Sequence, residues 1–290
     1  EGQDPFDLLD EVEKKLDIKV QPLSWPISKG YSFKGVYKIY DKALNLFESL
    51  KTKINDEVVT VDDINDPKVD QFCGEYAEQL REDIEIMALL VATIAWGNRK
   101  SIIKSGHSLI NLLGDCPYDY LMSNDHNQPL PFVHRTFNGE DLAFFLKGLK
   151  HIYSESTLEK TFAKHDVKNG LINFRDKMLG TQNGHRTKKH LSNPNANSAC
   201  KRLNMFLRWM VRSNAKGVDF GLWSSIPPSA LMVPLDVHTG NTARTLNLLI
   251  RKQNDWKALE ELMNVLVAFD PNDPTKYDFA LFGLGAMEEF

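Results

Sequence analysis

The sequence predicts an all-α protein, and three observations lead to this fold class. Apolar residues recur at helical spacing in several long segments, the segment 83–96 is apolar on nearly every side, and runs that favour β-strands are short. The chain has 290 residues, of which 42% are hydrophobic and 26% are charged. It is therefore long enough for one large helical domain or two small ones.

The expected helices can be placed in order along the chain. Helical spacing predicts helices over residues 6–16 and 36–50, whereas residues 58–61 form a β-prone run too short to define a sheet. The segment 83–96 (DIEIMALLVATIAW) is expected at the centre of a bundle, because a helix that is hydrophobic all round must be buried. Further helices are expected over residues 100–113, 139–153, 170–179, 199–211, 237–250, 256–269 and 277–287.

Composition narrows the class of protein. No segment approaches the roughly 18 apolar residues of a membrane helix, and the acidic residues 1–10, which lack an apolar run, are not expected to act as a signal peptide. The three cysteines, Cys73, Cys116 and Cys200, lie far apart, which predicts neither a disulfide framework nor a CxxC zinc or iron–sulfur site. A reducing, cytoplasmic environment and no contact with a membrane are therefore expected.

The net charge of −4 conceals an asymmetry. Residues 1–85 carry 20 acidic and 11 basic side chains, a balance of −9, so the remainder holds +5. Between Asp176 and Asp219 there is no acidic residue, and the basic residues there are Lys177, Arg186, Lys188, Lys189, Lys201, Arg202, Arg208, Arg212 and Lys216. One basic face is enough to release counterions from phosphates, so this stretch predicts nucleic-acid binding, with a solvated surface as the alternative.

A hairpin-like segment lies within the basic stretch. Residues 189–210 read KHLSNPNANSACKRLNMFLRWM, in which turn-forming residues lead into a helix that Asn197 or Ser198 is expected to cap. Amide groups at such a helix start bind phosphate. Lys201 falls in the first turn, where the helix dipole and Arg202 disfavour a protonated amine. A lysine in that setting can act as a Schiff-base nucleophile, whereas an isolated lysine is more often an exposed surface residue.

A second polar feature follows in residues 233–238, which read VPLDVH. Pro234 breaks the chain, and Asp236 stands where the next helix should begin, so its carboxylate is expected to cap that helix. A carboxylate fixed at a helix start can also orient the lysine, or stabilise positive charge that develops at C1′ of a sugar. Lys201 and Asp236 are therefore the candidate catalytic pair.

Around these residues the sequence resembles the HhH-GPD superfamily of DNA glycosylases, which includes endonuclease III, the adenine glycosylase and the 8-oxoguanine glycosylases. The resemblance rests on the buried helix 84–96 with the GNRK that follows, the hairpin 191–210, the segment VPLDVHTGNTAR at 233–244, and YDFALFGLGAM at 277–287. From about residue 83 to residue 290 the chain is similar to a little-characterised bacterial branch that was labelled as a family of unknown function.

The resemblance implies a two-lobed helical fold with a helix-hairpin-helix element. Residues 83–211 would form a helical barrel lobe that includes the hairpin, and residues 212–233 a connector. Residues 234–290 would complete the second lobe, on which the acidic segment 1–82 would pack. Duplex DNA with a damaged base would lie in the cleft between the lobes, bound by a monomer, with the base flipped into a pocket.

The resemblance also assigns roles to individual residues. Lys201 matches the nucleophile of the bifunctional glycosylases, Asp236 matches their aspartate, and His238 matches a residue that contacts DNA phosphate. The long gap between Lys201 and Asp236 resembles the archaeal 8-oxoguanine glycosylases, so 8-oxoguanine is the expected lesion. The other expected DNA-binding residues are Asn98, Arg186, Lys188, Lys189, Asn195, Asn197, Ser198 and Arg202.

The sequence departs from the superfamily at two places. The hairpin lacks the usual leucine-proline-glycine-x-glycine, and Asn193, Asn195 and Asn197 are expected to replace the glycines because asparagine tolerates left-handed conformations. The four cysteines that hold an iron–sulfur cluster in endonuclease III are also missing, so no cofactor is expected.

The base pocket is predicted from aromatic and polar residues near these motifs. Aromatic rings stack on flipped bases, and the candidates are Trp96, Phe206, Trp209 and Trp223, each with core packing as its alternative. His134, Arg135 and Asn138 lie in the segment FVHRTFNGED and are candidates to face the cleft. Asn98 is a candidate to fill the gap left by the flipped base. Asn98 and Asn138 could equally cap the helices that follow them.

Two other functions remain open from the sequence. A non-catalytic DNA-binding protein could keep the same scaffold, and its lysine and aspartate would then be dispensable. A metal-dependent phosphodiesterase is the third possibility, but the eight histidines are scattered without HxH or HExxH spacing.

Overall fold

The computed structural model describes residues 24–27, 34–39, 41–46, 57–180, 186–213 and 218–287. The chain divides into two compact units, residues 1–62 with 66–80, and residues 63–65 with 81–290. The helix predicted over residues 6–16 lies outside the described residues.

The first unit contains a four-stranded antiparallel sheet in which the strands pair in sequence order. The strands are β1 (Ser24–Ile27), β2 (Gly35–Lys38), β3 (Ala43–Leu46) and β4 (Glu57–Thr60). The helix predicted over residues 36–50 is therefore wrong, and the β-prone run at 58–61 belongs to a true sheet. Burial alternates along β2, which is the period of a strand. Lys42, at a φ of 50°, closes the turn into β3 and interrupts any helix.

Gly35 explains how closely the two central strands approach. A Cβ atom at this position would lie 2.0 Å from the carbonyl oxygen of Asn45 on β3. Only glycine fits there, so the close approach of β2 to β3 at this end of the pair requires Gly35. The helix α2 (Pro67–Cys73) follows the sheet, and Asp66 caps it by accepting a hydrogen bond from the amide of Lys68.

The second unit is helical and is built around the apolar segment predicted for its centre. The helix α3 (Tyr76–Ile94) carries this segment, and Ile86, Leu89 and Ile94 on it are fully buried. The helices that follow are α4 (Arg99–Leu113), α5 (Pro117–Ser123), α6 (Gly139–Glu155), α7 (Leu158–Phe162), α8 (Val167–Gly180) and α9 (Lys201–Val211). Of these, α4, α6, α8 and α9 agree with predicted ranges to within a few residues, whereas α5 and α7 were not predicted. A two-stranded hairpin, β5 (Val133–His134) with β6 (Phe137–Asn138), precedes α6.

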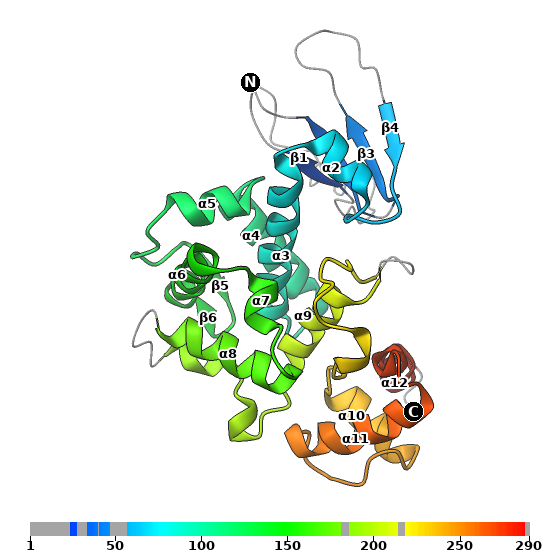
Figure 1. The fold of residues 1–290 in the computed structure, drawn as a ribbon. Helices are drawn as coiled ribbons and strands as arrows, with labels where there is room; N and C mark the ends of the chain where they lie inside the picture. The colour runs from blue at the N-terminus through cyan, green and yellow to red at the C-terminus, as the bar shows by residue number, and fades with distance from the viewer. Residues whose placement is uncertain are drawn as a thin grey trace, which may run out of the picture. The chain divides into compact units, whose positions relative to one another are not determined.

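Three C-terminal helices group together within this unit (Figure 1). They are α10 (Val237–Thr245), α11 (Trp256–Phe269) and α12 (Asp278–Met287). Helices α10 and α12 pack closely at Gly285, which has no side chain. A Cβ atom at this position would lie 2.5 Å from Thr242 Oγ1 on α10. The helix predicted over residues 237–250 ends early, at Thr245, and a loop that turns through Asn247 at a φ of 57° leads to α11.

Short 3-10 turns complete the unit. They are η2 (Thr187–His190), η3 (Pro194–Ala196), η5 (Pro228–Ala230) and η6 (Pro274–Tyr277). In the described part of the predicted connector, residues 218–233, η5 is the one regular element. Most described residues are helical, as predicted, but the two sheets mean that the chain is not purely α. None of the described helices combines the length and apolar character that crossing a membrane requires.

Candidate functional site

The structure brings together the two residues that the sequence proposes as a catalytic pair. Lys201 Nζ lies 3.9 Å from Asp236 Oδ2, and the side chains are 39% and 15% exposed. This separation is longer than a direct hydrogen bond of about 2.7–3.2 Å, so the amine is near the carboxylate without being locked to it. The two side chains are therefore close together without a hydrogen bond between them, and both are reachable from solvent.

Lys201 is the first residue of α9, and the preceding turn places it there. Cys200 stands at the N-cap position with a left-handed φ of 49°, and α9 has no capping side chain. The cap predicted from Asn197 or Ser198 is therefore wrong, since the helix begins further along the chain. Ser198 Oγ accepts instead from the amide of Cys200, at 3.3 Å. Burial raises the pKa of the Cys200 thiol to about 12, which keeps it protonated and unreactive beside Lys201.

Asp236 is the N-cap of α10, as predicted. Its Oδ1 accepts a hydrogen bond of 2.9 Å from the amide of Thr239, which leaves Oδ2 directed at Lys201. Asn254, from the loop before α11, donates from Nδ2 to the carbonyl oxygen of Asp236 at 2.7 Å. A Cβ atom at Gly240 would lie 2.5 Å from Asn254 Oδ1, so this support requires a glycine on α10. Sequence reasoning missed both Asn254 and Gly240, because their role depends on tertiary contact.

His238 lies exposed on the first turn of α10, two residues after Asp236. Its Nδ1 lies 3.0 Å from the carbonyl oxygen of Gly285, and donating a proton to that oxygen leaves Nε2 to face outward. The ring of Phe282 packs edge-on against it, with the centroids 5.7 Å apart. The imidazole is thus held in a fixed orientation in the first turn of the helix that Asp236 caps.

The hairpin turn before α9 is fastened to the start of α11. Asn197 Nδ2 donates to Asp255 Oδ2 at 2.7 Å, and the amide of Trp256 donates to the carbonyl oxygen of Asn197 at 3.0 Å. Asn197 has a left-handed φ of 60°, as expected of an asparagine that replaces a glycine. Asn193 and Asn195 do not adopt this conformation, and Asn195 is exposed.

The hairpin amides are used within the turn itself. The amides of Ala196 and Ser198 donate to the carbonyl oxygen of Asn193, and the amide of Asn195 donates to its side-chain oxygen. The amide of Asn197 donates to the carbonyl oxygen of Pro194. These four amides are therefore not available to a phosphate. The uncapped first turn of α9, where the sequence predicts phosphate-binding amides, and nearby side chains are the groups able to meet an anion.

A buried ion-pair network lies behind the site. Arg208, two turns after Lys201 on α9, donates to Asp219 at 3.2 Å and also to Asp278 at the start of α12. Arg212 donates to Asp219 at 2.7 Å and forms an ion pair of 2.9 Å with Asp273. These two arginines were part of the basic stretch predicted to face DNA, and they instead neutralise acids that come later in the sequence.

Asp278 is the acid in this network most affected by its surroundings. Burial raises its pKa to about 6, against the lowering effect of Arg208, and the charges of Asp236 and Asp219 raise the pKa further. Within the network, the three carboxylates of Asp219, Asp273 and Asp278 share two guanidinium groups. The network joins α9, which carries the lysine, to α12, which packs on the helix of the aspartate.

Arg202, predicted to bind DNA, is held inside the fold. Its guanidinium donates to the carbonyl oxygen of Thr93 and lies 4.8 Å from the ring centroid of Trp96. Burial lowers the pKa of Arg202. Trp96 is in turn stacked with His190, at a centroid separation of 5.7 Å. The side chains of Arg202 and Trp96 are both half-buried, and these contacts within the protein hold them in place.

Three other predicted pocket residues belong to the core. Phe206 is fully buried, with its ring centroid 5.4 Å from that of Trp223, which is itself buried and donates to Glu85. His134 is buried, 2.8 Å from Ser105 Oγ through Nδ1 and 3.2 Å from the carbonyl oxygen of Trp96 through Nε2. Apolar packing accounts for Phe206 and Trp223, as their core-packing alternative predicts, and hydrogen bonds within the protein account for His134.

The remaining predicted residues lie on or near the surface. Asn98 and Asn138 cap α4 and α6, which confirms the capping alternative for both. Arg186 donates to the buried carboxylate of Asp141 at 3.1 Å, so its charge is largely matched. Arg135 is exposed at a φ of 54°, and Trp209 is half-buried. Lys188 and Lys189 are exposed on η2.

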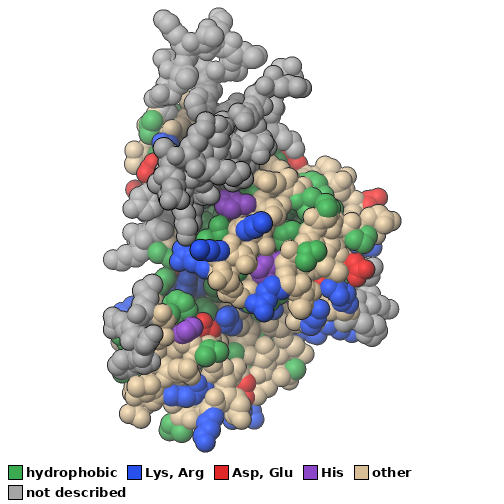
Figure 2. All heavy atoms as spheres, turned by 180° about the vertical axis from the view of Figure 1, so that it is seen from behind, with side chains coloured by type: hydrophobic (Ala, Val, Ile, Leu, Met, Phe, Trp, Pro, Cys, Tyr) green, Lys and Arg blue, Asp and Glu red, His purple; other side chains and the backbone are tan. Residues whose placement is uncertain are grey.

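One face of the molecule carries more basic than acidic side chains. On the face drawn in Figure 2, Lys and Arg side chains are more widespread than Asp and Glu side chains. A surface of this kind attracts polyanions even when the whole chain is acidic.

The chain was also compared with models of known protein families. Residues 70–287 match the family described as "Protein of unknown function (DUF2400)". The matched range covers more than half of the chain and includes α3 to α12, with Lys201, Asp236 and Asn254. It begins after the four-stranded sheet, and the family's description assigns no activity.

Proposed function

The chain belongs to the DUF2400 family, and we propose that it is a base-excision DNA glycosylase with AP-lyase activity. Lys201 is its nucleophile and Asp236 is its catalytic carboxylate. The observation that carries the proposal is the 3.9 Å separation of Lys201 Nζ from Asp236 Oδ2, at the starts of two helices. The hairpin before Lys201 and the VPLDVH segment around Asp236 support it, since both resemble the HhH-GPD glycosylases, whose two-lobed fold is part of this proposal.

The chemistry follows from an amine beside a carboxylate. The neutral amine of Lys201 attacks C1′ of the damaged nucleotide, the bond from C1′ to the base breaks, and the base leaves with the bonding electrons and takes up a proton. Asp236 stabilises the positive charge that develops on the sugar and accepts the proton that the attacking nitrogen releases. No cofactor enters this step.

The covalent intermediate accounts for strand cleavage. Ring opening of the sugar gives an imine between Lys201 and C1′, which acidifies the hydrogens at C2′. Loss of one C2′ proton expels the 3′-phosphate and breaks the C3′–O bond, and water then hydrolyses the imine and regenerates the amine. Asp236, after it has accepted a proton, can return it in the hydrolysis.

His238 and the start of α9 are proposed to position the DNA. The imidazole is exposed and oriented by Gly285, so a protonated Nε2 can donate to a phosphate next to the flipped nucleotide. The first-turn amides of α9 have no capping side chain and can meet a neighbouring phosphate. We propose 8-oxoguanine as the lesion, supported by the spacing of Lys201 and Asp236 and by His238.

Borohydride trapping tests the proposal. Hydride reduces the imine to a stable amine, so each turnover leaves a covalent protein–DNA adduct. We expect the adduct on at least one duplex in a panel of defined lesions, including 8-oxoguanine and an abasic site. Lys201→Ala should abolish it, and Asp236→Asn should slow it by about 100-fold or more. Asparagine caps helices as well as aspartate, so the second variant should keep the fold.

The controls separate catalysis from folding and binding. Lys160→Ala removes an exposed lysine from α7 and should trap like the natural protein. DNA binding without base release from any lesion would support the non-catalytic alternative. Trapping that persists in Lys201→Ala would exclude Lys201 as the nucleophile.

A further inference from the structure

We propose that one loop segment contacts the phosphate backbone of duplex DNA beside the hairpin. This loop comprises residues 250–257, which end the connection between α10 and α11 and enter the first turn of α11. The inference rests on the proposed function, because it takes DNA as the partner. It adds a contact surface in a segment that the superfamily resemblance leaves without a role.

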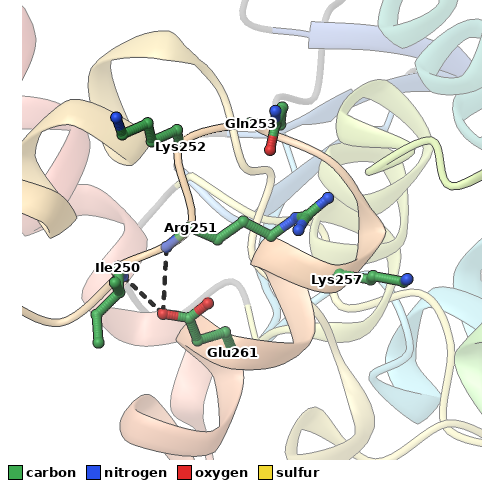
Figure 3. Close-up of a pocket in the computed structure, with 6 residues that line it drawn as sticks. All are labelled: Ile250, Arg251, Lys252, Gln253, Lys257 and Glu261. Carbon is green, nitrogen blue, oxygen red and sulfur yellow. Dashed lines mark hydrogen bonds between the residues drawn. The ribbon is translucent and has the colours of Figure 1, made fainter.

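The loop forms an open pocket of about 620 Å³ with a basic lining (Figure 3). The lining residues are Ile250, Arg251, Lys252, Gln253, Lys257 and Glu261. Three of the six are cationic and one is anionic. In Figure 3 Lys252 extends to one side of the loop, and Arg251 and Lys257 extend to the other.

The anionic groups nearby are already engaged, and two of the cations are not. Glu261 Oε1 accepts from the amide of Ile250 at 2.6 Å, which fixes the loop. Arg251 donates from Nε to Asp255 at 2.7 Å. Lys252 and Lys257 are exposed, and neither has an ion pair among the described residues. The two lysines are therefore the charges that an incoming polyanion would meet.

The position of the loop relates it to the proposed active site. The amide of Lys257 donates to Asn197 Oδ1 of the hairpin at 3.3 Å, and Asn254 supports Asp236. A DNA strand that reaches Lys201 therefore passes close to this loop. Since the hairpin amides are used within the turn, the lysine side chains supply phosphate contacts that the hairpin itself does not.

The geometry favours a polymer over a small anion. The amides of Trp256, Lys257 and Ala258 at the start of α11 already bond to Asn197 or Asp255, so no group of amides is available to enclose one phosphate. The cationic side chains diverge, which suits successive phosphates along a strand.

Salt-dependent binding to an undamaged fluorescent duplex tests the inference. Each phosphate contact contributes about 0.9 to the slope of log affinity against log salt, so Lys252→Ala/Lys257→Ala should reduce the slope by about 2. Lys252→Arg/Lys257→Arg keeps both charges and should retain the slope. Lys160→Ala/Lys164→Ala removes two exposed charges elsewhere and should also retain it.

The outcomes separate this inference from the proposed function. A slope that is unchanged in the Lys252→Ala/Lys257→Ala variant, while the natural protein binds DNA, would overturn the inference and leave the glycosylase proposal intact. An equal loss in the Lys160→Ala/Lys164→Ala variant would overturn it too, because the effect would then reflect net charge alone. Failure of the natural protein to bind duplex DNA at any salt concentration would overturn both.

Discussion

Asn254 donates a hydrogen bond of 2.7 Å from its side-chain amide to the backbone carbonyl oxygen of Asp236. The Oδ1 atom of the same side chain accepts from Arg244 at 2.6 Å, so hydrogen bonds to both the oxygen and the nitrogen of the amide fix its orientation. The carboxylate beside Lys201 is therefore held at its backbone by a residue eighteen positions later in the chain. Asn254 is a positioning residue in the proposed reaction.

Replacing Asn254 with alanine should slow the reaction without removing a reacting group. Loss of an outer support of this kind typically costs about 10- to 100-fold in activity at a catalytic site. We expect Asn254→Ala to lower the single-turnover rate of borohydride trapping by that factor, with DNA affinity unchanged. Asn264→Ala, at an exposed position on α11, is the matched control. Equal rates in the two variants would remove Asn254 from the mechanism.

Two substitutions at Asn197 should separate backbone strain from side-chain bonding. Both Asn197→Gly and Asn197→Ala lose the bond to Asp255, but only alanine must place a Cβ atom at a φ of 60°. A left-handed conformation costs an ordinary residue about 1 kcal/mol more than glycine. Urea unfolding should therefore find both variants less stable than the natural protein, with alanine the lower of the two by about 1 kcal/mol. A glycine variant less stable than the alanine variant would contradict this.

The raised pKa of Asp278 predicts a specific pH dependence of stability. Its pKa is about 6 in the folded chain and near 3.8 when unfolded, so the unfolded state ionises first as the pH rises. The stability that Asp278 contributes is therefore fully present below about pH 4. It is lost as the pH rises from about 4 through about 6. A shift of about 2 pKa units corresponds to about 3 kcal/mol.

Asp278→Asn isolates this contribution because the amide does not titrate. The stability of the natural protein relative to this variant should fall by about 3 kcal/mol between about pH 4 and pH 7. Asp270→Asn is the control of opposite sign, since a hydrogen bond from Lys276 lowers the pKa of Asp270. There the relative stability of the natural protein should rise with pH. A flat difference for Asp278→Asn would show that Arg208 keeps the carboxyl ionised.

The Cys200 thiol should resist alkylation although it precedes the proposed nucleophile. Burial raises its pKa to about 12, and the thiolate is the reactive form. Mass spectrometry after iodoacetamide treatment at neutral pH should find Cys200 unmodified in the folded protein and labelled after denaturation. Rapid labelling of the native protein would show that the start of α9 opens in solution.

The sequence predicted those parts of the site that depend on local structure. Asp236 as a helix cap, Lys201 in the first turn of α9 and a left-handed Asn197 each follow from a few neighbouring residues, and the structure confirms all three. The approach of Lys201 to Asp236 was expected from the character of the two residues and from the resemblance, and the structure places the two side chains 3.9 Å apart.

The errors arise where distant residues decide the outcome. Arg208 and Arg212 stand in a stretch without acids, so only the fold reveals that Asp219, Asp273 and Asp278 neutralise them. For Phe206, the neighbouring sequence does not distinguish a ring that packs in the core from a ring that stacks on a flipped base. The first sheet was missed because the apolar residues of 36–50 also fit helical spacing. The turn at Lys42 was not predicted either, because a lysine rarely adopts the left-handed conformation that it has there.

The pairing of Asn254 with Asp236 and of Asp255 with Asn197 has a consequence for how the loop can evolve. Two consecutive residues serve two partners on different elements, so an insertion or deletion between α10 and α11 would displace both at once. A surface loop normally varies freely in length. The length of this loop is fixed, because its residues must reach both the hairpin and Asp236. Substitutions at Lys252 and Gln253 should be tolerated by the fold, whereas a change of a single residue in the length of the loop should not.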